Sequence, residues 1–307
     1  MLPISHARRP ALLIVGCGDI GLRVLRLLRG RFRVLALTSS PARVSELRAA
    51  GATPLLGDLD DAATLGRLAA LAERVLHLAP PPAQGSADPR TRHLLQALAR
   101  SRRARRIVYA STSGVYGDAG GARFDETRAV NPATDRARRR VDAEACMRHH
   151  GRAHAVCSSI LRVPGIYAFD RKGGDPRERV RRAAPLLAAA DDVYTNHIHA
   201  DDLARACVAA LMRAAPQRIY HVCDDSDWKM GDYFDAVANA FGLPLSPRVE
   251  RRHAAQKLSP LQMSFLAESR RLDNQRLNGE LRLRLHYPTP DVAWAAALAT
   301  DRPASRR

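Results

Sequence analysis

Short apolar runs alternate with amphipathic segments through the first half of the chain. Apolar runs predict strands at residues 11–18, 32–40, 52–58, 74–82 and 105–117. Segments with leucine, valine and alanine at helical spacing predict helices between them, at residues 20–30, 41–51, 61–72 and 91–101. Gly30 and Gly51 are stop signals for two of these helices. Asp60 or Asp61 is expected to cap the third. The alternation predicts an α/β fold, a Rossmann-type doubly wound parallel sheet covered by helices.

The second half of the chain is less regular. Two further strands are predicted near residues 156–163 and 217–223, and an amphipathic helix at residues 200–214. The remainder predicts helices and loops of a smaller lobe. We therefore expect an NAD(P)-binding Rossmann domain over residues 1–160 and a smaller substrate-binding lobe over residues 161–307. The two later strands are expected to return to the sheet of the first domain.

A glycine-rich turn joins the first predicted strand to the first predicted helix. Gly16, Gly18 and Gly21 form the pattern G-x-G-x-x-G. In such a turn the first glycine allows the tight bend, and the second lets a pyrophosphate approach the backbone. The third lets the helix pack closely on the strand, and the helix N-terminus offers N–H groups to the anion. With a strand before it and a helix after it, the pattern predicts a dinucleotide site that includes Asp19 and Ile20. The alternative is an ordinary glycine-rich turn.

The end of the second predicted strand bears on the choice between NAD and NADP. An acidic residue about twenty positions after the glycines selects the ribose 2′-hydroxyl of NAD. This chain has Thr38, Ser39 and Ser40 there, with Arg43 close behind and no carboxylate. Hydroxyl groups and an arginine suit a 2′-phosphate, so the sequence favours NADP. The alternative for Arg43 is a solvated helix residue without a ligand.

Further motifs follow in order along the chain: "LLGDLDD", "HLAPPP", "YASTSGVYGD", "LRVPGIY" and "NHIHADDLARA". Together with the glycine loop they resemble the extended short-chain dehydrogenase/reductase superfamily, and more closely its NAD-dependent epimerase/dehydratase group, over about residues 11–225. The resemblance implies an NAD(P)-binding oxidoreductase or epimerase/dehydratase-like protein that acts on a nucleotide sugar or a small carbonyl compound. In such folds Asp58 and Leu59 lie where adenine contacts are usual. Ala79 and Pro80 are expected to join the cofactor site.

The positions that match the family's acid–base residues differ from its pattern. Thr112 matches the hydroxyl residue that hydrogen-bonds the substrate carbonyl, and Tyr116 lies in the loop just after it. In the family, a tyrosine and, four residues later, a lysine lie on one helix face, where they exchange the proton and hold the nicotinamide ribose. Alignment on the glutamate that follows places Arg136 and Arg140 at these positions. Arginine stays protonated near pH 7, so Arg136 cannot exchange a proton, whereas Arg140 can still hold a ribose or phosphate.

Other groups could supply the missing acid or base. Tyr116 and Tyr167 lie in loops that face the cofactor cleft in the family. His197 and His199 lie near the substrate side, and histidine titrates near neutral pH. Each also has a structural interpretation, as an aromatic ring packed on the cleft wall or a histidine that caps the helix from Asp201. Two functions stay open: an enzyme with a displaced acid–base residue, and a non-catalytic NAD(P)-binding sensor or regulatory protein.

Composition narrows the remaining classes of function. The net charge is +18, but all except three of the 49 basic residues are arginines, in separate groups and without a recognition motif. Nucleic-acid binding is therefore not expected. The five cysteines have no metal-ligand spacing, so we expect no metal site and free thiols in a reducing cytoplasm. No run reaches the roughly 18 apolar residues of a membrane span, and the first apolar run leads into glycines rather than a signal-peptide cleavage site.

The resemblance also implies a homodimer. Family members often dimerise through the helices that carry the tyrosine and the lysine. Here that helix is strongly basic, and like charges would repel across a dimer unless acidic groups such as Asp142 and Glu144 pair across it.

Overall fold

A seven-stranded sheet forms the centre of the computed structural model, which describes residues 9–301. Its strands lie in the order β11-β7-β5-β4-β1-β2-β3. Their bounds are β1 Ala11–Val15, β2 Arg33–Thr38, β3 Thr53–Leu56, β4 Arg74–His77, β5 Arg106–Thr112, β7 Cys157–Val163 and β11 Arg218–His221. The predicted α/β fold with a Rossmann-type sheet is thereby confirmed.

The order of the strands reverses beside β1. β1 pairs in parallel with β2 on one side and with β4 on the other, and the parallel pairing continues to β3 and to β5. The chain therefore leaves the carboxyl ends of β1 and β4 in opposite directions. A crevice for ligands forms at such a switch point in open α/β sheets.

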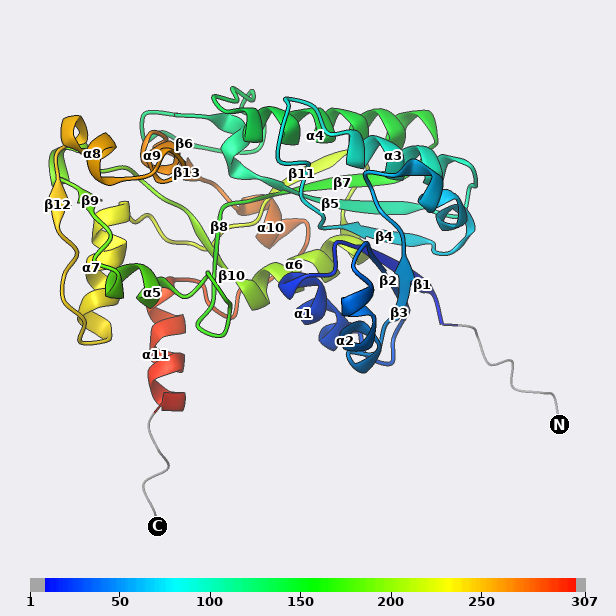
Figure 1. Ribbon diagram of the computed structural model, residues 1–307, viewed down its shortest axis with the longest axis horizontal. Coiled ribbons are helices and arrows are strands. Elements are labelled where there is room, and N and C mark those ends of the chain that lie inside the picture. Colours follow the sequence, from blue (N-terminus) through cyan, green and yellow to red (C-terminus); the bar gives the residue numbers. More distant parts are fainter. Residues whose placement is uncertain (1–8, 302–307) are drawn as a thin grey trace, which may run out of the picture. The chain divides into compact units, whose positions relative to one another are not determined.

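Helices cover both faces of this sheet. Figure 1 shows α3 and α4 on one side and α1 and α2 on the other. Their bounds are α1 Asp19–Leu28, α2 Val44–Ala49, α3 Pro89–Ala99 and α4 Asp135–Ala153. The helix predicted at residues 61–72 forms as a 3-10 helix, Ala62–Ala70, and the Asp61 carboxylate caps it by accepting from the Ala63 N–H.

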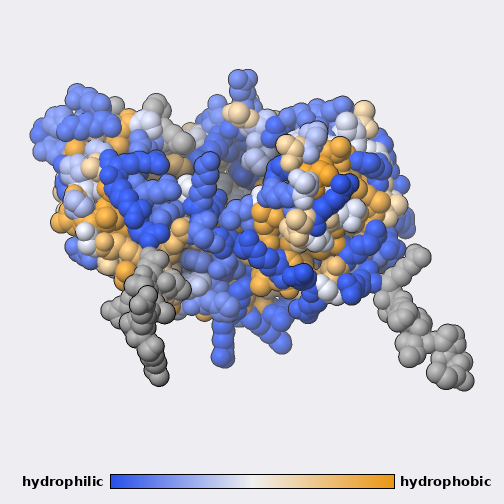
Figure 2. All heavy atoms as spheres, turned by 60° about the horizontal axis from the view of Figure 1, so that its bottom comes forward, coloured by the Kyte–Doolittle hydropathy of each residue, from blue (hydrophilic) through white to orange (hydrophobic). Residues whose placement is uncertain are grey.

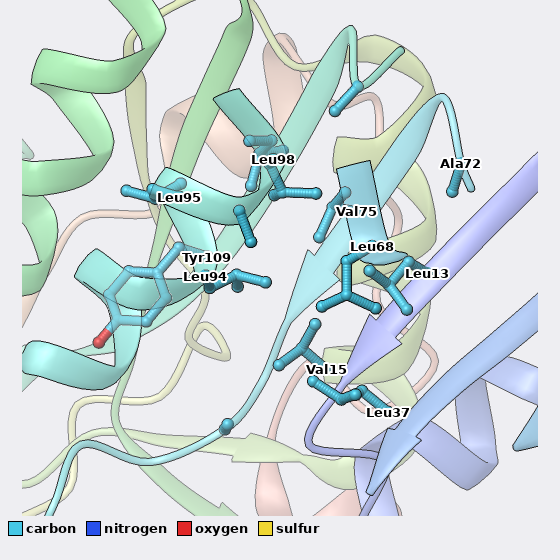
Figure 3. Close-up of a cluster of buried hydrophobic side chains, with 14 of the residues drawn as sticks. Leu13, Val15, Leu37, Leu68, Ala72, Val75, Leu94, Leu95, Leu98 and Tyr109 are labelled. Atoms are coloured by element: carbon cyan, nitrogen blue, oxygen red, sulfur yellow. The ribbon is translucent and has the colours of Figure 1, made fainter. Parts of the chain in front are cut away.

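The core between the sheet and α3 is made of aliphatic side chains. Leu13 and Val15 of β1, with Val75 of β4, are fully buried there. Figure 3 shows Leu94, Leu95 and Leu98 of α3 packing over this face, with the Tyr109 ring among them and its hydroxyl directed away from the aliphatic side chains. Because β1 is buried on both faces, its sequence reads as a continuous apolar run rather than as an alternating pattern.

The described chain divides into two compact units. The first unit consists of residues up to Ser111 together with Arg139–Leu161 and Cys207–Ile219. The second consists of Thr112–Arg138, Arg162–Ala206 and the chain from Tyr220 onward. The division expected from the sequence, residues 1–160 and 161–307, stays a prediction.

Short paired strands and short helices build much of the second unit. Three parallel two-stranded pairs join β8 Gly165–Tyr167 to β10 His197–His199, β9 Leu186–Leu187 to β12 Arg248–Val249, and β6 Arg123–Phe124 to β13 Arg271–Leu272. The helices are α5 Pro176–Arg181, α7 Met230–Ala240, α8 Arg251–Lys257, α9 Pro260–Leu266, α10 Gln275–Gly279 and α11 Pro290–Asp301. Helix α6, Ala200–Arg213, begins in this unit and ends in the first. The part of the chain that the structure describes also has three short 3-10 helices, at Pro41–Arg43, Ser113–Tyr116 and Ala189–Asp191.

Hydrophilic side chains cover most of the face drawn in Figure 2. Several of the arginines are ion-paired rather than free, for example Arg90 with Asp60 and Arg138 with Asp135. Within residues 9–301, no helix combines the length and the apolar character needed to cross a membrane.

Candidate functional site

The three glycines after β1 each meet a different steric requirement. Gly16 has φ +80°, and a β-carbon there would lie 2.5 Å from the Cα of Ala79, in the segment after β4. A β-carbon on Gly18 would have no atom within 4 Å, so the space above this residue is open. A β-carbon on Gly21 would lie 2.9 Å from the Cys17 sulfur, which shows how closely α1 packs on the loop. This is the division of roles that a pyrophosphate loop needs.

The first turn of α1 begins next to this open space. Its N-cap residue, Gly18, has no side chain that could cap the first N–H groups of the helix. Such N–H groups, with the positive end of the helix dipole, favour an anion. Asp19 adds a negative charge at this position, but the Arg23 Nε lies 3.2 and 3.3 Å from its two oxygens. The buried Arg23 side chain thus offsets a charge that would otherwise repel a pyrophosphate.

Arg43 lies against the same loop. Its Nη1 donates to the carbonyl oxygen of Cys17 at 2.7 Å, while its Nε and Nη2 donate to the two carboxylate oxygens of Glu46 at 2.9 and 3.0 Å. The hydrogen bonds to Glu46 raise the pKa of the Arg43 guanidinium, and those from Arg43 lower the pKa of Glu46. Thr38, at the end of β2, uses its hydroxyl to accept from the Ser40 N–H, and Ser39 is exposed.

The other predicted cofactor-site residues follow β3 and β4 in the same unit. Asp58 accepts from the Asp60 N–H, and its own N–H donates to the Thr64 hydroxyl, so the turn after β3 is fixed locally. Leu59 is buried, and its carbonyl bonds to the His93 ring. Ala79 is buried against Gly16 and Pro80 is exposed. The structure therefore brings the ends of β1 and β4 together, and the roles of these residues toward a cofactor stay predictions.

Arg140 is anchored to strand β5. Its Nη1 donates to the Tyr109 hydroxyl at 2.9 Å and to the Ala110 carbonyl at 2.8 Å. Burial raises the pKa of Tyr109, and the positive charge of Arg140 acts in the opposite direction. One turn later, Glu144 accepts from the Ser111 hydroxyl at 2.7 Å. These bonds fasten α4 to β5 and fix the guanidinium plane.

The acidic groups that could have joined two basic α4 helices are engaged within the chain. Asp142 accepts from the Asp88 N–H at 2.7 Å and from Arg92 of α3. Glu144 accepts from Arg148 as well as from Ser111. A homodimer stays a prediction.

Arg136 has a different environment in the second unit. It is exposed, and its Cζ lies 4.7 Å from the ring centroid of Phe265 in α9. Such stacking suits a guanidinium, which is weakly hydrated and planar. The position that resembles the family's tyrosine thus carries a cation stacked on an aromatic ring.

Tyr116 lies in a buried hydrogen-bond network. Its hydroxyl accepts from the Arg162 Nη1 at 2.6 Å and lies 2.6 Å from the His221 Nε2. Burial lowers the pKa of His221 to about 3, so the ring is neutral near pH 7. Its Nδ1 lies 2.8 Å from the Asp273 carbonyl and must donate there, so we assign Nε2 as the acceptor of the Tyr116 proton. The network leaves Tyr116 only 1% exposed.

Thr112 and the two histidines named from the sequence make local contacts. The Thr112 hydroxyl accepts from the Gly114 N–H and caps the 3-10 helix that follows. His199 accepts from the Asp201 N–H at the start of α6. His197 is stacked on Tyr233 at a centroid distance of 4.0 Å, and burial lowers its pKa to about 3. Both histidines thus have structural contacts, and an acid–base role for either stays a prediction.

Several contacts of the site escaped the sequence analysis. The Asp19–Arg23 and Arg43–Glu46 pairs have helical spacings of four and three residues, so both could have been found by a search for ion pairs along the helices. Tyr109 lies 31 residues from Arg140 along the chain and His221 lies 105 residues from Tyr116, and no local pattern signals these contacts. Among the described residues, no group of three or more histidine, cysteine, aspartate or glutamate side chains is arranged to hold a metal ion.

Comparison with known proteins identifies related folds. A functionally unknown conserved protein from Silicibacter pomeroyi is 29% identical, with a TM-score of 0.80 over 95% of this chain and 99% of that chain. UDP-glucose 4-epimerase from Thermotoga maritima, solved with UDP-glucose, is 17% identical, with a TM-score of 0.75 over 94% and 99%. A double mutant of dTDP-glucose 4,6-dehydratase from Streptomyces venezuelae, solved with NAD, is 20% identical, with a TM-score of 0.72 over 93% and 96%.

A search of curated proteins found no match to this sequence. The model of the NAD dependent epimerase/dehydratase family matches residues 12–223, which include the glycine loop, Arg140, Tyr116 and all of α6. This span is well over half of the 307 residues. The chain therefore belongs to the NAD dependent epimerase/dehydratase family.

Proposed function

We propose that this chain binds a nicotinamide dinucleotide over Gly16–Gly21 and acts as an oxidoreductase or an epimerase/dehydratase-like protein on a nucleotide sugar or a small carbonyl compound. The observation that carries the proposal is the open space above Gly18, next to a loop that is otherwise closely packed on Ala79 and Cys17. Asp19 and Ile20 would present first-turn N–H groups to the pyrophosphate, with the Asp19 charge offset by Arg23.

The finer proposal is a preference for NADP. Arg43 supports it, because the guanidinium lies on the Cys17 carbonyl and about one third of its side chain is exposed to a ligand. Thr38 and Ser39 would add hydroxyl groups at the end of β2. Asp58 and Leu59 would line the adenine, and Ala79 and Pro80 would line the cofactor on the β4 side.

The bound nicotinamide would supply hydride transfer to or from carbon. Thr112 is proposed to hydrogen-bond the substrate carbonyl, and Arg140 to hold a ribose or phosphate with the guanidinium edge that Tyr109 and Ala110 leave free. Tyr116 is the proposed proton donor or acceptor. The hydrogen bond from the Arg162 guanidinium supports this role, since it would stabilise negative charge on the Tyr116 oxygen once the proton has moved to the substrate.

A second candidate function is a non-catalytic NAD(P) sensor or regulatory protein. Two observations favour it. The Tyr116 hydroxyl is buried between Arg162 and His221, and the α4 positions that resemble the family's tyrosine and lysine are Arg136 and Arg140. Such a protein would keep the dinucleotide site and lack turnover.

Calorimetric titration with NADP⁺, NADPH, NAD⁺ and NADH tests the common part of both candidates. Binding of a dinucleotide to the wild-type chain, with loss of binding in Gly18→Ala, is the expected result. The absence of binding by all four would overturn both candidates. Hydride transfer is then followed at the NAD(P)H absorbance with nucleotide sugars and aldehydes, and epimerisation by chromatography of the sugar products. Turnover selects the enzyme, whereas binding without turnover selects the sensor.

A further inference from the structure

The Arg43 guanidinium is held in a two-pronged ion pair. Its Nε and Nη2 donate to the two oxygens of Glu46 at 2.9 and 3.0 Å, and its Nη1 donates to the Cys17 carbonyl at 2.7 Å. The pair forms because Arg43 ends the 3-10 helix and Glu46 lies in the first turn of α2, three residues on and on the same face. All three guanidinium nitrogens thus have partners within the chain.

Glu46 supplies a carboxylate that the end of β2 lacks. Thr38 ends the strand, and Ser39 and Ser40 follow it without an acidic residue. Arg43 contacts both the Glu46 carboxylate and the Cys17 carbonyl of the phosphate loop. Only the Arg43 guanidinium therefore separates this carboxylate from the loop. Side-chain exposures of 32% for Arg43 and 48% for Glu46 leave both groups open to solvent and to a ligand.

We propose that Glu46 is a specificity-determining residue that sets the balance between NADP and NAD by competing for Arg43. The inference rests on the proposed dinucleotide site. A 2′-phosphate must displace the Glu46 carboxylate from the Arg43 Nε and Nη2. Otherwise it binds beside this carboxylate, and the two negative charges repel each other. A 2′-hydroxyl carries no charge and can donate to the same carboxylate. Glu46 therefore weakens NADP binding and leaves NAD binding unchanged or stronger.

Glu46→Gln tests the inference, because it keeps the size of the side chain and removes its charge. Removing one like charge about 6 Å from the phosphate, at a surface dielectric of about 40, should tighten NADP⁺ binding by about tenfold. Affinity for NAD⁺ should stay within about twofold of wild type or fall slightly. The measurement is the dissociation constant of each cofactor by calorimetry at low salt.

Two further variants separate the specific effect from a general one. Glu178→Gln is the control, because Glu178 on α5 is a comparable surface carboxylate that pairs with Arg182 at 3.4 Å. This variant should change the affinity for neither NADP⁺ nor NAD⁺. In the Arg43→Met background, Glu46→Gln should no longer favour NADP⁺, because the contested guanidinium is absent. Adenosine 2′,5′-bisphosphate and AMP repeat the comparison without the nicotinamide half.

Each outcome of this experiment either supports or overturns the proposed role of Glu46. A wild-type chain that binds neither cofactor overturns the dinucleotide site and this inference with it. A wild-type chain that binds a cofactor while Glu46→Gln shifts both affinities equally, or shifts neither, overturns the role of Glu46 alone. A gain for NADP⁺ that persists in the Arg43→Met background also overturns it, because the effect would then act without Arg43.

Discussion

A β-carbon added to Gly16 would lie 2.5 Å from the Cα of Ala79, which joins the turn after β1 to the segment after β4. The contact brings together the two chain segments that diverge at the switch point of the sheet. Gly16 also has φ +80°, in the left-handed region that favours glycine. Gly16→Ala should therefore lower the free energy of unfolding by about 2–4 kcal/mol, from backbone strain and overpacking together. Urea denaturation checks this, and an unchanged midpoint would contradict the contact.

Gly18→Ala should behave in the opposite way. Nothing lies within 4 Å of a β-carbon there, and φ at this residue is −82°, so the folded state should keep its stability within about 0.5 kcal/mol. Dinucleotide affinity should fall at least about tenfold, because the methyl group occupies the approach of the pyrophosphate. Gly279→Ala is the matched control, since its β-carbon also has no neighbour within 4 Å and it lies on α10. Equal affinities for the two variants would argue against the site.

Tyr116→Phe removes a hydroxyl that serves two partners. It leaves the Arg162 Nη1 and the His221 Nε2 without this partner, and a buried polar group left unpaired costs about 1–3 kcal/mol. The thermal midpoint should fall accordingly. If Tyr116 also exchanges the substrate proton, kcat should fall much further than the fraction of folded protein accounts for. A loss of stability with unchanged kcat would assign Tyr116 a structural role only.

The hydrogen bond between Arg140 and Tyr109 should be measurable as a coupling free energy in a double-mutant cycle. Arg140→Met leaves the Tyr109 hydroxyl buried without its donor, and Tyr109→Phe removes that hydroxyl. The double variant should therefore be more stable than the sum of the single effects suggests, by about 1–2 kcal/mol. Additive effects in urea denaturation would mean that the two side chains do not interact in solution.

Stability should fall as the pH is lowered from about 6.5 towards 4. Burial lowers the pKa values of four histidines to about 3 or 4, so the unfolded chain takes up protons in this window that the folded chain does not: His77, His150, His197 and His221. Asp224 acts in the opposite sense, because burial raises its pKa to about 7 and the folded chain already holds that proton. These five groups give a net uptake of about three protons on unfolding near pH 5.

The pH dependence of urea denaturation, followed between pH 4 and 7, measures this uptake. In Asp224→Asn the opposing proton is absent, so stability should fall more steeply with acid, with an uptake of about four protons. An unchanged slope in this variant would show that Asp224 is ionised in the folded chain at pH 5.

The sheet and the phosphate loop could be predicted because their signals are local. The run "ALLIVGCGDIG" contains a buried strand, a turn and a helix start, and each uses a residue type suited to its position. The short strands of the second unit could not be predicted in this way. Arg123–Phe124 and Arg271–Leu272 pair across 148 residues of chain, and two residues carry no periodicity. Their pairing depends on tertiary contacts that the sequence does not display.

The candidate site shows the same contrast. The three glycines and Arg43 were identified from spacing alone, whereas the partner that occupies Arg43 is an ordinary glutamate on the next helix. Tyr116 was identified from its motif, but its partner His221 lies on β11 and acquires its neutral state through burial. Spacing therefore identified the residues that resemble the family's pattern. Only the folded chain shows which side chains form hydrogen bonds with them.

The pairing of Asp19 with Arg23 has a consequence for ionic strength. Because the two charges offset each other beside the loop, the pyrophosphate would be held mainly by neutral N–H dipoles, which salt screens little at short range. A 2′-phosphate bound by the part-exposed Arg43 would instead weaken as salt is added. The affinities for NADP and NAD should therefore converge at high ionic strength, so this protein would discriminate between the two cofactors most strongly in dilute buffer.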